Sequence, residues 1–298
     1  MRILYFGNGI RGQTCLKTMV NQGENVVGVV AHPGEKSTVA RLAEKLGLRY
    51  FQPKKVNARS FLEEVNKLGP DLCVLSGYNQ ILRKEILSIP KFGVINLHGG
   101  RLPEYRGVAP INWQILNGEV KGGCSIIYVD EGIDTGDIIA QDYYDISPND
   151  DAATATEKTL QIFPPLLVES LARIREGTVK RIRQDPNAGC YYTRRYPKDG
   201  EIDWNTMTAV QVHNLVRALV KPYPGAFTHH VTKRIVIWKT SLLTNVIKGI
   251  PGRVPLKQNL GAVVIAADRA LLIEKVSIGE SEKIIDARPC FDLGDDLG

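Results

Sequence analysis

Short apolar runs alternate with segments of helical periodicity through the first half of the sequence, and this alternation constrains the fold more than any other feature. Strands are expected at Arg2–Phe6, Val26–Ala31, Leu72–Ser76, Val94–Leu97, Cys124–Val129 and Ile138–Tyr144. Helices are expected at Gly12–Gln22, Thr38–Leu46, Ser60–Leu68, Arg83–Leu87, Pro110–Asn117 and Ala153–Glu176. The pattern predicts an α/β fold with a Rossmann-like, mostly parallel sheet and helices on both faces. Ligands of such sheets bind beyond the carboxyl ends of the strands.

The second half has a different character. After Gly177 the chain is polar, basic and rich in turns, which is typical of a linker. A helix is expected at Thr208–Val220, followed by strands at Ala226–Val231, Ile235–Thr240, Ala262–Ala266 and Ala270–Lys275. These runs predict a small antiparallel, OB-like β-domain. We therefore divide the chain into a first domain (1–190), a linker (191–207) and a C-terminal helix with a β-barrel-like domain (208–298).

Gly7, Gly9 and Gly12 have the spacing G-x-G-x-x-G between the first strand and the first helix. This is the arrangement of a dinucleotide-binding turn, which also needs an acidic residue at the end of the second strand. Here that strand is followed by His32 and Pro33, with neither an acidic residue nor an arginine. We therefore expect a tight turn that allows close packing, and no bound NAD.

Asn96 and His98 close the apolar run before two glycines. Because side chains alternate along a strand, the two project from one face. An amide can hydrogen-bond an oxygen on which negative charge develops, and an imidazole can also move a proton near neutral pH. Such a pair suits chemistry at a carbonyl group. A capping Asn beside a packed His is the plain alternative.

Asp134 lies between Gly132 and Gly136 in the segment "VDEGIDTGDI". A carboxylate in such a loop could orient an imidazole and favour its protonated form. A calcium loop formed by the acidic residues of this segment is one competing interpretation, although the spacing does not fit an EF-hand. A solvated acidic turn is the other.

Composition limits the remaining classes of function. The five cysteines are scattered without metal-ligand spacing, so we expect no metal and a reduced, cytoplasmic protein. No apolar run is long enough to cross a membrane. The net charge of +6 suits an anionic partner without requiring one. His229 and His230 are neighbours on an expected strand and face opposite sides, so they are not expected to share a metal.

Together the central motifs resemble the folate-dependent formyltransferase family. They are Asn96-Leu97-His98, the segment "RLPEYRGVAP" and Asp134 in "GIDTGDI", in that order. The likeness continues into the tail, through "DWNTMTAVQVHNLVRALVKPYPGAF" and "IVIWKTS". One departure is that many members have Ser-Leu-Leu-Pro after the His and the small residue, whereas this chain has Gly100-Arg101-Leu102-Pro103.

The resemblance implies an enzyme that transfers the formyl group of N10-formyltetrahydrofolate to an amine, with no metal and no NAD. It implies that Asn96 and His98 stabilise the tetrahedral oxyanion, that His98 accepts the amine proton, and that Asp134 orients His98. The pterin would lie along backbone groups of one segment and the loop before Asp134, at the residues Gln80, Ile81, Leu82, Gly132 and Ile133.

Two branches of the family differ in their acceptor. One formylates methionyl-tRNA, and the other formylates amino groups of nucleotide-linked sugars. The loop after the second strand has no run of lysines and arginines, and "HPGEK", "YRGVAPINW" and "YPGAF" look like the sugar branch, close to the formyltransferase part of the lipid A aminoarabinose enzyme. We therefore expect a nucleotide-sugar acceptor, in lipopolysaccharide or glycan biosynthesis, with methionyl-tRNA as the alternative. A nucleic acid or membrane partner is not expected, and a homodimer is one assembly open to the chain.

Four residues are candidate substrate contacts. Arg194 and Arg195 could bind a diphosphate in bidentate fashion, and Arg106 beside the central motif could do the same. For each, an exposed and solvated guanidinium is the alternative. Tyr78 could stack on substrate or line the site, whereas core packing is expected for Trp113.

Overall fold

The computed structural model describes residues 1–34, 37–259 and 261–298. Glu35 and Lys36 of the "HPGEK" segment therefore lie outside the described residues. The chain divides into two compact units, which we describe separately. The first comprises Met1–Pro110, Gly122–Tyr144 and Glu157–Tyr192, and the second comprises Ile111–Lys121, Asp145–Thr156 and Thr193–Gly298.

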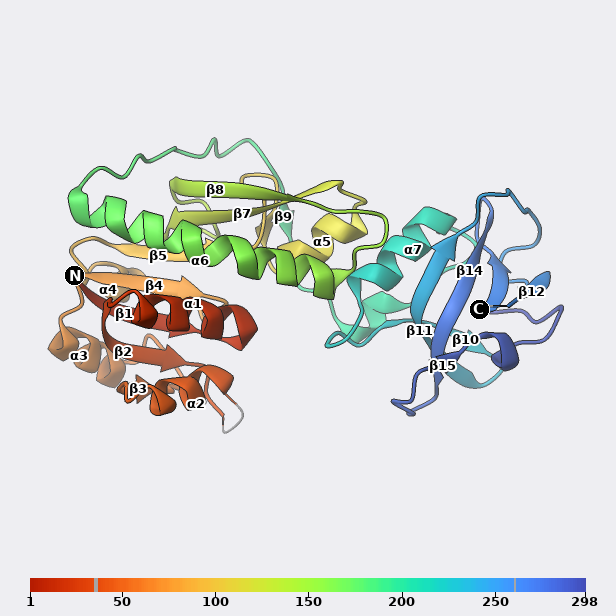
Figure 1. Ribbon diagram of the computed structural model, residues 1–298, viewed down its shortest axis with the longest axis horizontal. Coiled ribbons are helices and arrows are strands. Elements are labelled where there is room, and N and C mark those ends of the chain that lie inside the picture. The colour runs from red at the N-terminus through yellow and green to blue at the C-terminus, as the bar shows by residue number, and fades with distance from the viewer. Residues whose placement is uncertain (35–36, 260) are drawn as a thin grey trace. The chain divides into compact units, whose positions relative to one another are not determined.

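A seven-stranded sheet with the order β3-β2-β1-β4-β5-β7-β8 forms the centre of the first unit (Figure 1). Its strands are β1 (Arg2–Gly7), β2 (Asn25–Ala31), β3 (Tyr50–Phe51), β4 (Leu72–Ser76), β5 (Val94–His98), β7 (Lys121–Tyr128) and β8 (Ile138–Asp145). Neighbours from β3 to β5 pair in parallel, whereas β7 pairs antiparallel with β5. The predicted mostly parallel sheet is confirmed.

Helices cover both faces of this sheet (Figure 1). They are α1 (Gly9–Asn21), α2 (Thr38–Lys45), α3 (Arg59–Leu68), α4 (Lys84–Leu87) and α6 (Ala152–Glu176), and α5 (Pro110–Leu116) follows the motif region. Leu4 and Phe6 of β1 pack with Phe61 and Val65 of α3 on one face. On the other face the hydroxyl of Tyr5 donates to the carbonyl oxygen of Gly12 in α1. Because side chains alternate along β1, this strand contributes residues to the packing on both faces of the sheet.

The glycine turn between β1 and α1 is a point of close approach. A Cβ on Gly12 would lie 3.1 Å from the carbonyl carbon of Gly7 and 3.2 Å from the carbonyl oxygen of Ser76. Only a residue without a side chain lets α1 pack this closely on the sheet. The predicted start of the helix at Gly12 is wrong by three residues, because Gly9 takes a left-handed φ of 62° and opens the helix there.

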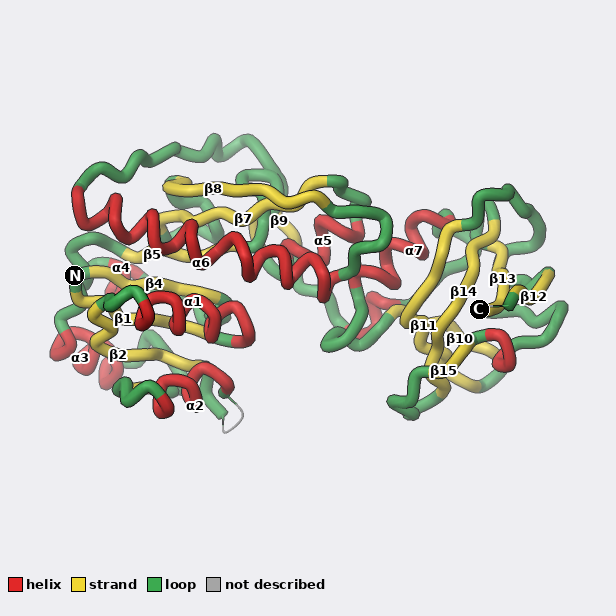
Figure 2. Tube along the Cα trace, viewed as in Figure 1, coloured by secondary structure: helices red, strands yellow, loops and turns green. Residues whose placement is uncertain are grey.

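An antiparallel sheet with the order β10-β11-β14-β13-β12 forms the second unit (Figure 2). Its strands are β10 (Ala226–His230), β11 (Lys233–Leu242), β12 (Leu256–Gln258), β13 (Gly261–Ile265) and β14 (Ala270–Ile278), and β15 (Ile285–Asp286) pairs with β14. The α-helix that follows the linker is α7 (Ala209–Ala218), which packs Val212, Leu215 and Val216 against Ile235 and Ile237 of β11. The predicted antiparallel C-terminal domain is confirmed.

Each unit is built from several separate segments of the chain. Residues 111–121 and 145–156, which the sequence placed inside the first domain, belong to the second unit. There the amide of Asn112 donates to the carbonyl oxygen of Ala218, and Arg217 donates to the carbonyl oxygens of Ser147 and Asp150. Among the described residues, no helix is both long enough and apolar enough to span a lipid bilayer.

Candidate functional site

Asn96, His98 and Asp134 meet in the first unit. Asn96 and His98 project from one face of β5, and Asp134 comes from the loop between β7 and β8. The amide Nδ2 of Asn96 lies 3.4 Å from Oδ1 of Asp134, and Nδ1 of His98 lies 3.5 Å from Oδ2. The three side chains therefore bring an amide, an imidazole and a carboxylate to one point, as the sequence predicted.

Both ring nitrogens of His98 face oxygen atoms. Its Nε2 lies 2.6 Å from the carbonyl oxygen of Tyr105, and its Nδ1 faces the carboxylate of Asp134. A carbonyl oxygen only accepts hydrogen bonds, so Nε2 carries the proton of this contact. Proton exchange at His98 is thereby confined to Nδ1. The imidazole is only 5% exposed, so its orientation is fixed by these two partners.

Gly100 makes the contact between His98 and Tyr105 possible. A Cβ at this position would lie 2.7 Å from Nε2 of His98, 2.7 Å from the carbonyl oxygen of Tyr105 and 2.8 Å from Cβ of Pro110. Real Cβ atoms essentially never come this close to a neighbour. Many members of the family have a serine at this position, whereas the packing around Gly100 in this chain leaves no room for a side chain.

The loop that carries Asp134 has its own hydrogen bonds. Asp134 has a φ of 53°, and its Oδ2 accepts a hydrogen bond of 2.9 Å from the backbone N–H of Gly107. Oδ1 of Asp130 accepts from the N–H of Gly132 and from the hydroxyl of Thr135. Asp130 thus closes the turn. No three or more His, Cys, Asp or Glu side chains converge to hold a metal within residues 1–34, 37–259 and 261–298.

The expected pterin segment is held in place by its neighbours. Asn57 donates to the carbonyl oxygen of Ile81 and accepts from the N–H of Arg83. The side chain of Gln80 accepts from the N–H of Val56, and Leu82 is buried in the core. Ile81 is 72% exposed, and Ile133 in the Asp134 loop is also exposed. Two exposed apolar side chains beside ordered backbone groups fit a flat ring with polar edges. Folate binding at these residues stays a prediction.

Tyr78, two residues after the end of β4, is partly buried and packs against the core of the first unit. Its ring lies edge-to-face with Phe6, with centroids 5.4 Å apart. Burial raises the pKa of its phenol to about 12. The hydroxyl oxygen is buried, and no hydrogen-bond partner for it lies within the part of the chain that the structure describes. Tyr78 therefore packs against the core while part of its surface remains accessible, and its contact with substrate stays a prediction.

The prediction that Arg106 contacts phosphate is wrong. Its side chain is 1% exposed, and Nε and Nη2 both donate to Oε1 of Gln184. Nη1 donates to the carbonyl oxygen of Ala188, and Nη2 also reaches that of Asp185. The guanidinium is enclosed and its donors are engaged, so it holds the 184–188 segment and has no face for a substrate.

Arg194 and Arg195 do not form a paired clamp. Arg194 is exposed, whereas the guanidinium of Arg195 donates to the carbonyl oxygen of Asp199 and lies 5.1 Å from the ring of Trp113. Burial lowers the pKa of the Arg195 guanidinium. Trp113 is only half-buried and donates to the carbonyl oxygen of Thr193, so the expected core packing is wrong. Arg195 and Trp113 thus bind backbone oxygens of the linker and hold it in place.

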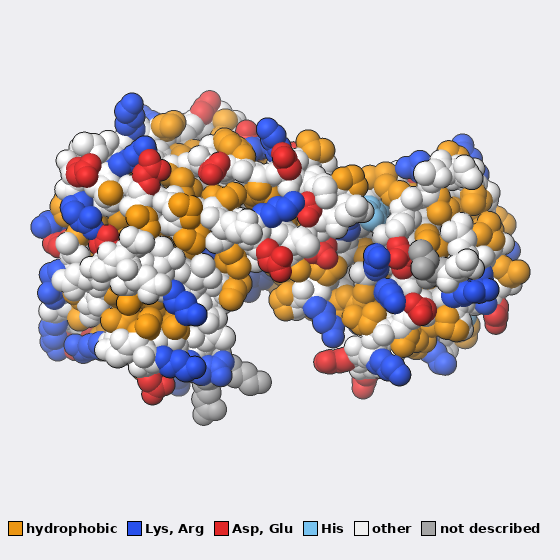
Figure 3. All heavy atoms as spheres, viewed as in Figure 1, with side chains coloured by type: hydrophobic (Ala, Val, Ile, Leu, Met, Phe, Trp, Pro, Cys, Tyr) orange, Lys and Arg blue, Asp and Glu red, His pale blue; other side chains and the backbone are white. Residues whose placement is uncertain are grey.

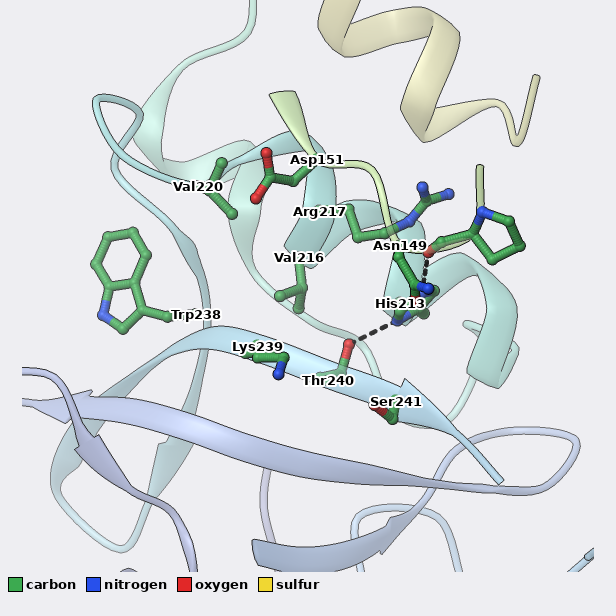
Figure 4. A pocket seen from close by; sticks show the side chains of 11 residues that line it. Asn149, Asp151, His213, Val216, Arg217, Val220, Trp238, Lys239, Thr240 and Ser241 are labelled. Carbon is green, nitrogen blue, oxygen red and sulfur yellow. Dashed lines mark hydrogen bonds between the residues drawn. The ribbon is translucent and has the colours of Figure 1, made fainter. Parts of the chain in front are cut away.

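A cavity of about 370 Å³ opens in the second unit between α7, β11 and the segment 148–151 (Figure 4). His213 lines the cavity, with its Nδ1 at 2.9 Å from the hydroxyl of Thr240 and its Nε2 at 3.3 Å from the carbonyl oxygen of Pro148. Lys239 pairs with Glu274, and Arg217 donates to backbone oxygens. The charged side chains that line the cavity are all engaged by other groups of the protein, so we assign it no ligand.

Sequence reasoning missed three contributors to the site. They are the carbonyl of Tyr105, the N–H of Gly107 and the buried side chain of Gln184, which donates to the carbonyl oxygens of Asp134 and Gly136. Backbone groups leave no signal in a sequence. Gln184 stands in the turn-rich segment after Gly177, and a glutamine within such a polar stretch does not reveal that it is buried.

Known proteins match almost the whole length of the chain. The model of the formyl transferase family matches residues 1–171, and that of the formyl transferase C-terminal domain matches residues 195–291. The methionyl-tRNA formyltransferase of Ruminiclostridium cellulolyticum is 33% identical over 295 residues, which cover 95% of this chain and 94% of that relative. Further relatives of the same name, from species of Clostridioides and Geobacter, are 32–34% identical.

Solved structures share the fold at lower identity. The methionyl-tRNA formyltransferase from Clostridium thermocellum has a TM-score of 0.63 and 18% identity, covering 96% of this chain and 100% of that chain. An N-formyltransferase from Helicobacter canadensis, in complex with folinic acid and dTDP-3-aminofucose, has a TM-score of 0.69 and 21% identity, covering 92% and 99%. These likenesses concern the fold alone.

Proposed function

Since this chain belongs to the formyl transferase family, we propose that it transfers the formyl group of N10-formyltetrahydrofolate to the α-amino group of methionyl-tRNA. As a member of that family it is a folate-dependent N-formyltransferase. The acceptor is the proposed part. The observation that carries it is the identity of 33% to a methionyl-tRNA formyltransferase over 95% of the chain, which includes the C-terminal domain.

The expectation of a nucleotide-sugar acceptor is overturned by the same observation. It depended on three short segments and on the absence of basic residues from one loop. Relatives that are 32–34% identical over more than nine-tenths of the chain all have the other name. Agreement along almost the whole chain outweighs a few local resemblances. The expectation that nucleic acid is not a partner is therefore given up together with the sugar acceptor.

The geometry around Asp134 suits attack of an amine on a formyl carbon. In the proposed reaction the amine nitrogen forms a bond to that carbon, and the carbonyl oxygen takes up negative charge. The amide of Asn96 can donate a hydrogen bond to this oxygen, and Nδ1 of His98 can donate a second one after it has taken up the proton of the attacking amine. Fixed donors at a developing oxyanion are the largest single term in many enzymes. Collapse of the tetrahedral intermediate then breaks the bond between the formyl carbon and N10, and N10 takes up the proton that the His98–Asp134 pair received from the amine.

The attacking amine must lose a proton, and the structure limits where it goes. Nε2 of His98 is engaged by the carbonyl oxygen of Tyr105, so only Nδ1 of His98 and the carboxylate of Asp134 can accept it. The two groups lie 3.5 Å apart and form one acid–base pair. The predicted role of His98 as proton acceptor is thus narrowed to one nitrogen.

Charge is compatible with a tRNA acceptor. The chain has a net charge of +6, and the part from Asn205 onward has 12 Lys and Arg against 8 Asp and Glu. On the face seen in Figure 3, basic side chains are spread over both units and alternate with acidic ones. The net positive charge favours phosphate contacts by lysines and arginines. Formation of a homodimer stays a prediction.

A direct assay tests the proposed acceptor. The purified chain is offered methionyl-tRNA and N10-formyltetrahydrofolate, and formyl-methionine is measured by mass spectrometry after hydrolysis of the tRNA ester. We expect formylation that depends on the folate donor and is absent in a His98→Gln variant. Wild-type protein that consumes the donor with other amines but leaves methionyl-tRNA unformylated would contradict the proposal.

A further inference from the structure

Gln184 lies in the segment that leads away from α6. Two residues before it, Ile182 exchanges both backbone hydrogen bonds with Ile138, at 2.9 Å each, which fixes the segment to the start of β8. The side chain of Gln184 is then 7% exposed and directed into the first unit. A buried amide is costly unless its donors and its acceptor are satisfied, so its partners matter.

The two ends of the Gln184 amide bind two different elements. Its Nε2 donates to the carbonyl oxygen of Asp134 at 2.9 Å and to that of Gly136 at 2.7 Å. Its Oε1 accepts from Nε of Arg106 at 3.1 Å and from Nη2 at 2.9 Å. The orientation is dictated by the partners, because arginine only donates and carbonyl oxygens only accept. All the usual hydrogen bonds of one amide are used.

These bonds span the loop that carries the carboxylate of the site. Asp134 has a left-handed backbone, a conformation that an aspartate tolerates but that needs support from its surroundings. Its Oδ2 accepts from the N–H of Gly107, the residue next to Arg106. The Asp134 loop and the 106–107 strand (β6, Arg106–Gly107) are therefore joined twice, directly through Gly107 and indirectly through Gln184.

We propose that Gln184 is a positioning residue for formyl transfer, which holds the Asp134 loop against Arg106 so that the carboxylate faces Nδ1 of His98 and the amide of Asn96. Gln184 touches none of the reacting groups. The catalytic part of this inference rests on the proposed function, because it needs the reaction to be measured. The structural part, that Gln184 fixes the loop, does not.

The test replaces Gln184 with methionine, which has a similar length and no hydrogen bonds. Misplacing a reacting group by about 1 Å can cost about 10²-fold in rate, so we expect kcat for methionyl-tRNA to fall about 10- to 100-fold with little change in KM. Gln52→Met is the matched control. The amide of Gln52 also donates to two loop carbonyls, those of His32 and Gly34, away from Asp134. Its kcat should stay within about threefold of wild type.

A double-mutant cycle separates positioning from general destabilisation. In an Asp134→Asn background the loop no longer carries a carboxylate, so Gln184→Met should add little further reduction in kcat. If the two reductions in kcat multiply, Gln184 acts independently of Asp134 and the proposal is overturned. An equal effect of Gln52→Met would overturn it as well.

Amide hydrogen exchange without substrates tests the structural part by itself. Gln184→Met should speed exchange in the segment 130–137 about tenfold, while Gln52→Met leaves that segment unchanged. Unchanged exchange in Gln184→Met would overturn the proposal whatever the assay shows. Faster exchange in a protein whose wild type does not formylate methionyl-tRNA would support the loop contact and count against the proposed acceptor alone.

Discussion

Among single residues, Gly100 has very little room beside His98. Replacing it with alanine would place a Cβ 2.7 Å from both Nε2 of His98 and the carbonyl oxygen of Tyr105. The imidazole or the 101–105 segment must then move, and Nδ1 moves with the ring. We expect Gly100→Ala to lower kcat by about tenfold or more, measured with saturating methionyl-tRNA and folate donor.

Gly249 provides the control for this substitution. A Cβ there would lie 3.4 Å from Cγ1 of Ile265, an ordinary contact. Gly249→Ala should leave kcat unchanged. Wild-type kcat in Gly100→Ala would show that the packing around His98 can relax at no cost to the reaction.

The two nitrogens of His98 have separable roles, which a single variant distinguishes. Glutamine at position 98 can still donate an N–H toward Tyr105 but has no group in place of Nδ1. Loss of one donor at a developing oxyanion typically costs about 10²- to 10³-fold in rate. We expect His98→Gln to reduce kcat by at least that much. Fluorescence titration should show unchanged binding of the folate donor.

A near-normal kcat in His98→Gln would remove Nδ1 from the mechanism. The same variant with no folate binding would mean instead that His98 shapes the donor site. Both results are measured on a folded protein, which the thermal unfolding profile checks.

The sequence was sufficient for the three central side chains and insufficient for their support. Asn96 and His98 are two apart on a strand, so alternation places them on one face, whereas the place of Asp134 beside His98 was implied by the resemblance to the family. Arg106 and Gln184 are 78 residues apart, and only the packed fold brings the guanidinium to the amide. An arginine beside a glycine therefore looked like a phosphate contact although it is buried.

At the scale of elements, His213 connects α7 to β11 and to the segment at Pro148. In the neutral ring, Nε2 donates to the carbonyl oxygen of Pro148 and Nδ1 accepts from Thr240. Burial, assisted by the positive charge of Arg217, lowers the pKa of His213 below its ordinary value of 6.5, and Glu274 opposes the shift. The unfolded chain therefore binds more protons than the folded one just below pH 6.5.

Stability of the second unit should consequently fall as the pH drops through about 6.5 and below. All three tryptophans, Trp113, Trp204 and Trp238, belong to that unit, so their fluorescence follows its unfolding. We expect the unfolding midpoint to decrease on acidification in wild type and to change less in His213→Gln. Equal pH dependence of the two proteins would assign the effect to another group.

Long, periodic elements were predicted well and the shortest ones were missed. The six long strands of the first sheet and α7 follow from alternation and from helical spacing, and Thr208 with Gln211 forms the capping box that starts α7. The two-residue strands β3, β6, β9 (Tyr191–Tyr192) and β15 have no period to detect. They exist because a partner strand lies beside them.

At the scale of the whole molecule, the division of the chain into domains shows what a linear reading of the sequence omits. The predicted domains are continuous segments of the sequence, whereas the second unit also includes residues 111–121 and 145–156. Both segments are flanked by elements of the first sheet and have ordinary composition. Their membership depends on side-chain contacts such as that of Asn112 with Ala218, which no composition change marks.

Binding of a tRNA also belongs to this scale, because it depends on the summed charge of the protein. Each phosphate that a lysine or arginine neutralises releases counterions, so affinity falls with salt in proportion to the number of neutralised phosphates. Besides Arg195, two further cations of the second unit lie against aromatic rings: Lys221 is 5.7 Å from the ring centroid of Trp238, and Arg234 is 4.0 Å from that of Phe227. A cation beside an aromatic ring suits a nucleic acid backbone with exposed bases.

We expect replacement of both Lys221 and Arg234 by alanine to raise KM for methionyl-tRNA. The slope of log affinity against log salt should fall in magnitude by about one for each phosphate that these side chains neutralise in the wild type. The kcat at saturating tRNA should not change, because phosphate binding acts equally in the ground and transition states.

The control is a double variant of the first unit. Lys67→Ala with Lys91→Ala removes the same charge there, where the two lysines pair with Glu64 and Asp71. If both double variants lower the slope equally, net charge decides tRNA binding. If only the first does, the phosphates lie on the β-domain, and an unchanged slope in the first would exclude Lys221 and Arg234 from the tRNA interface.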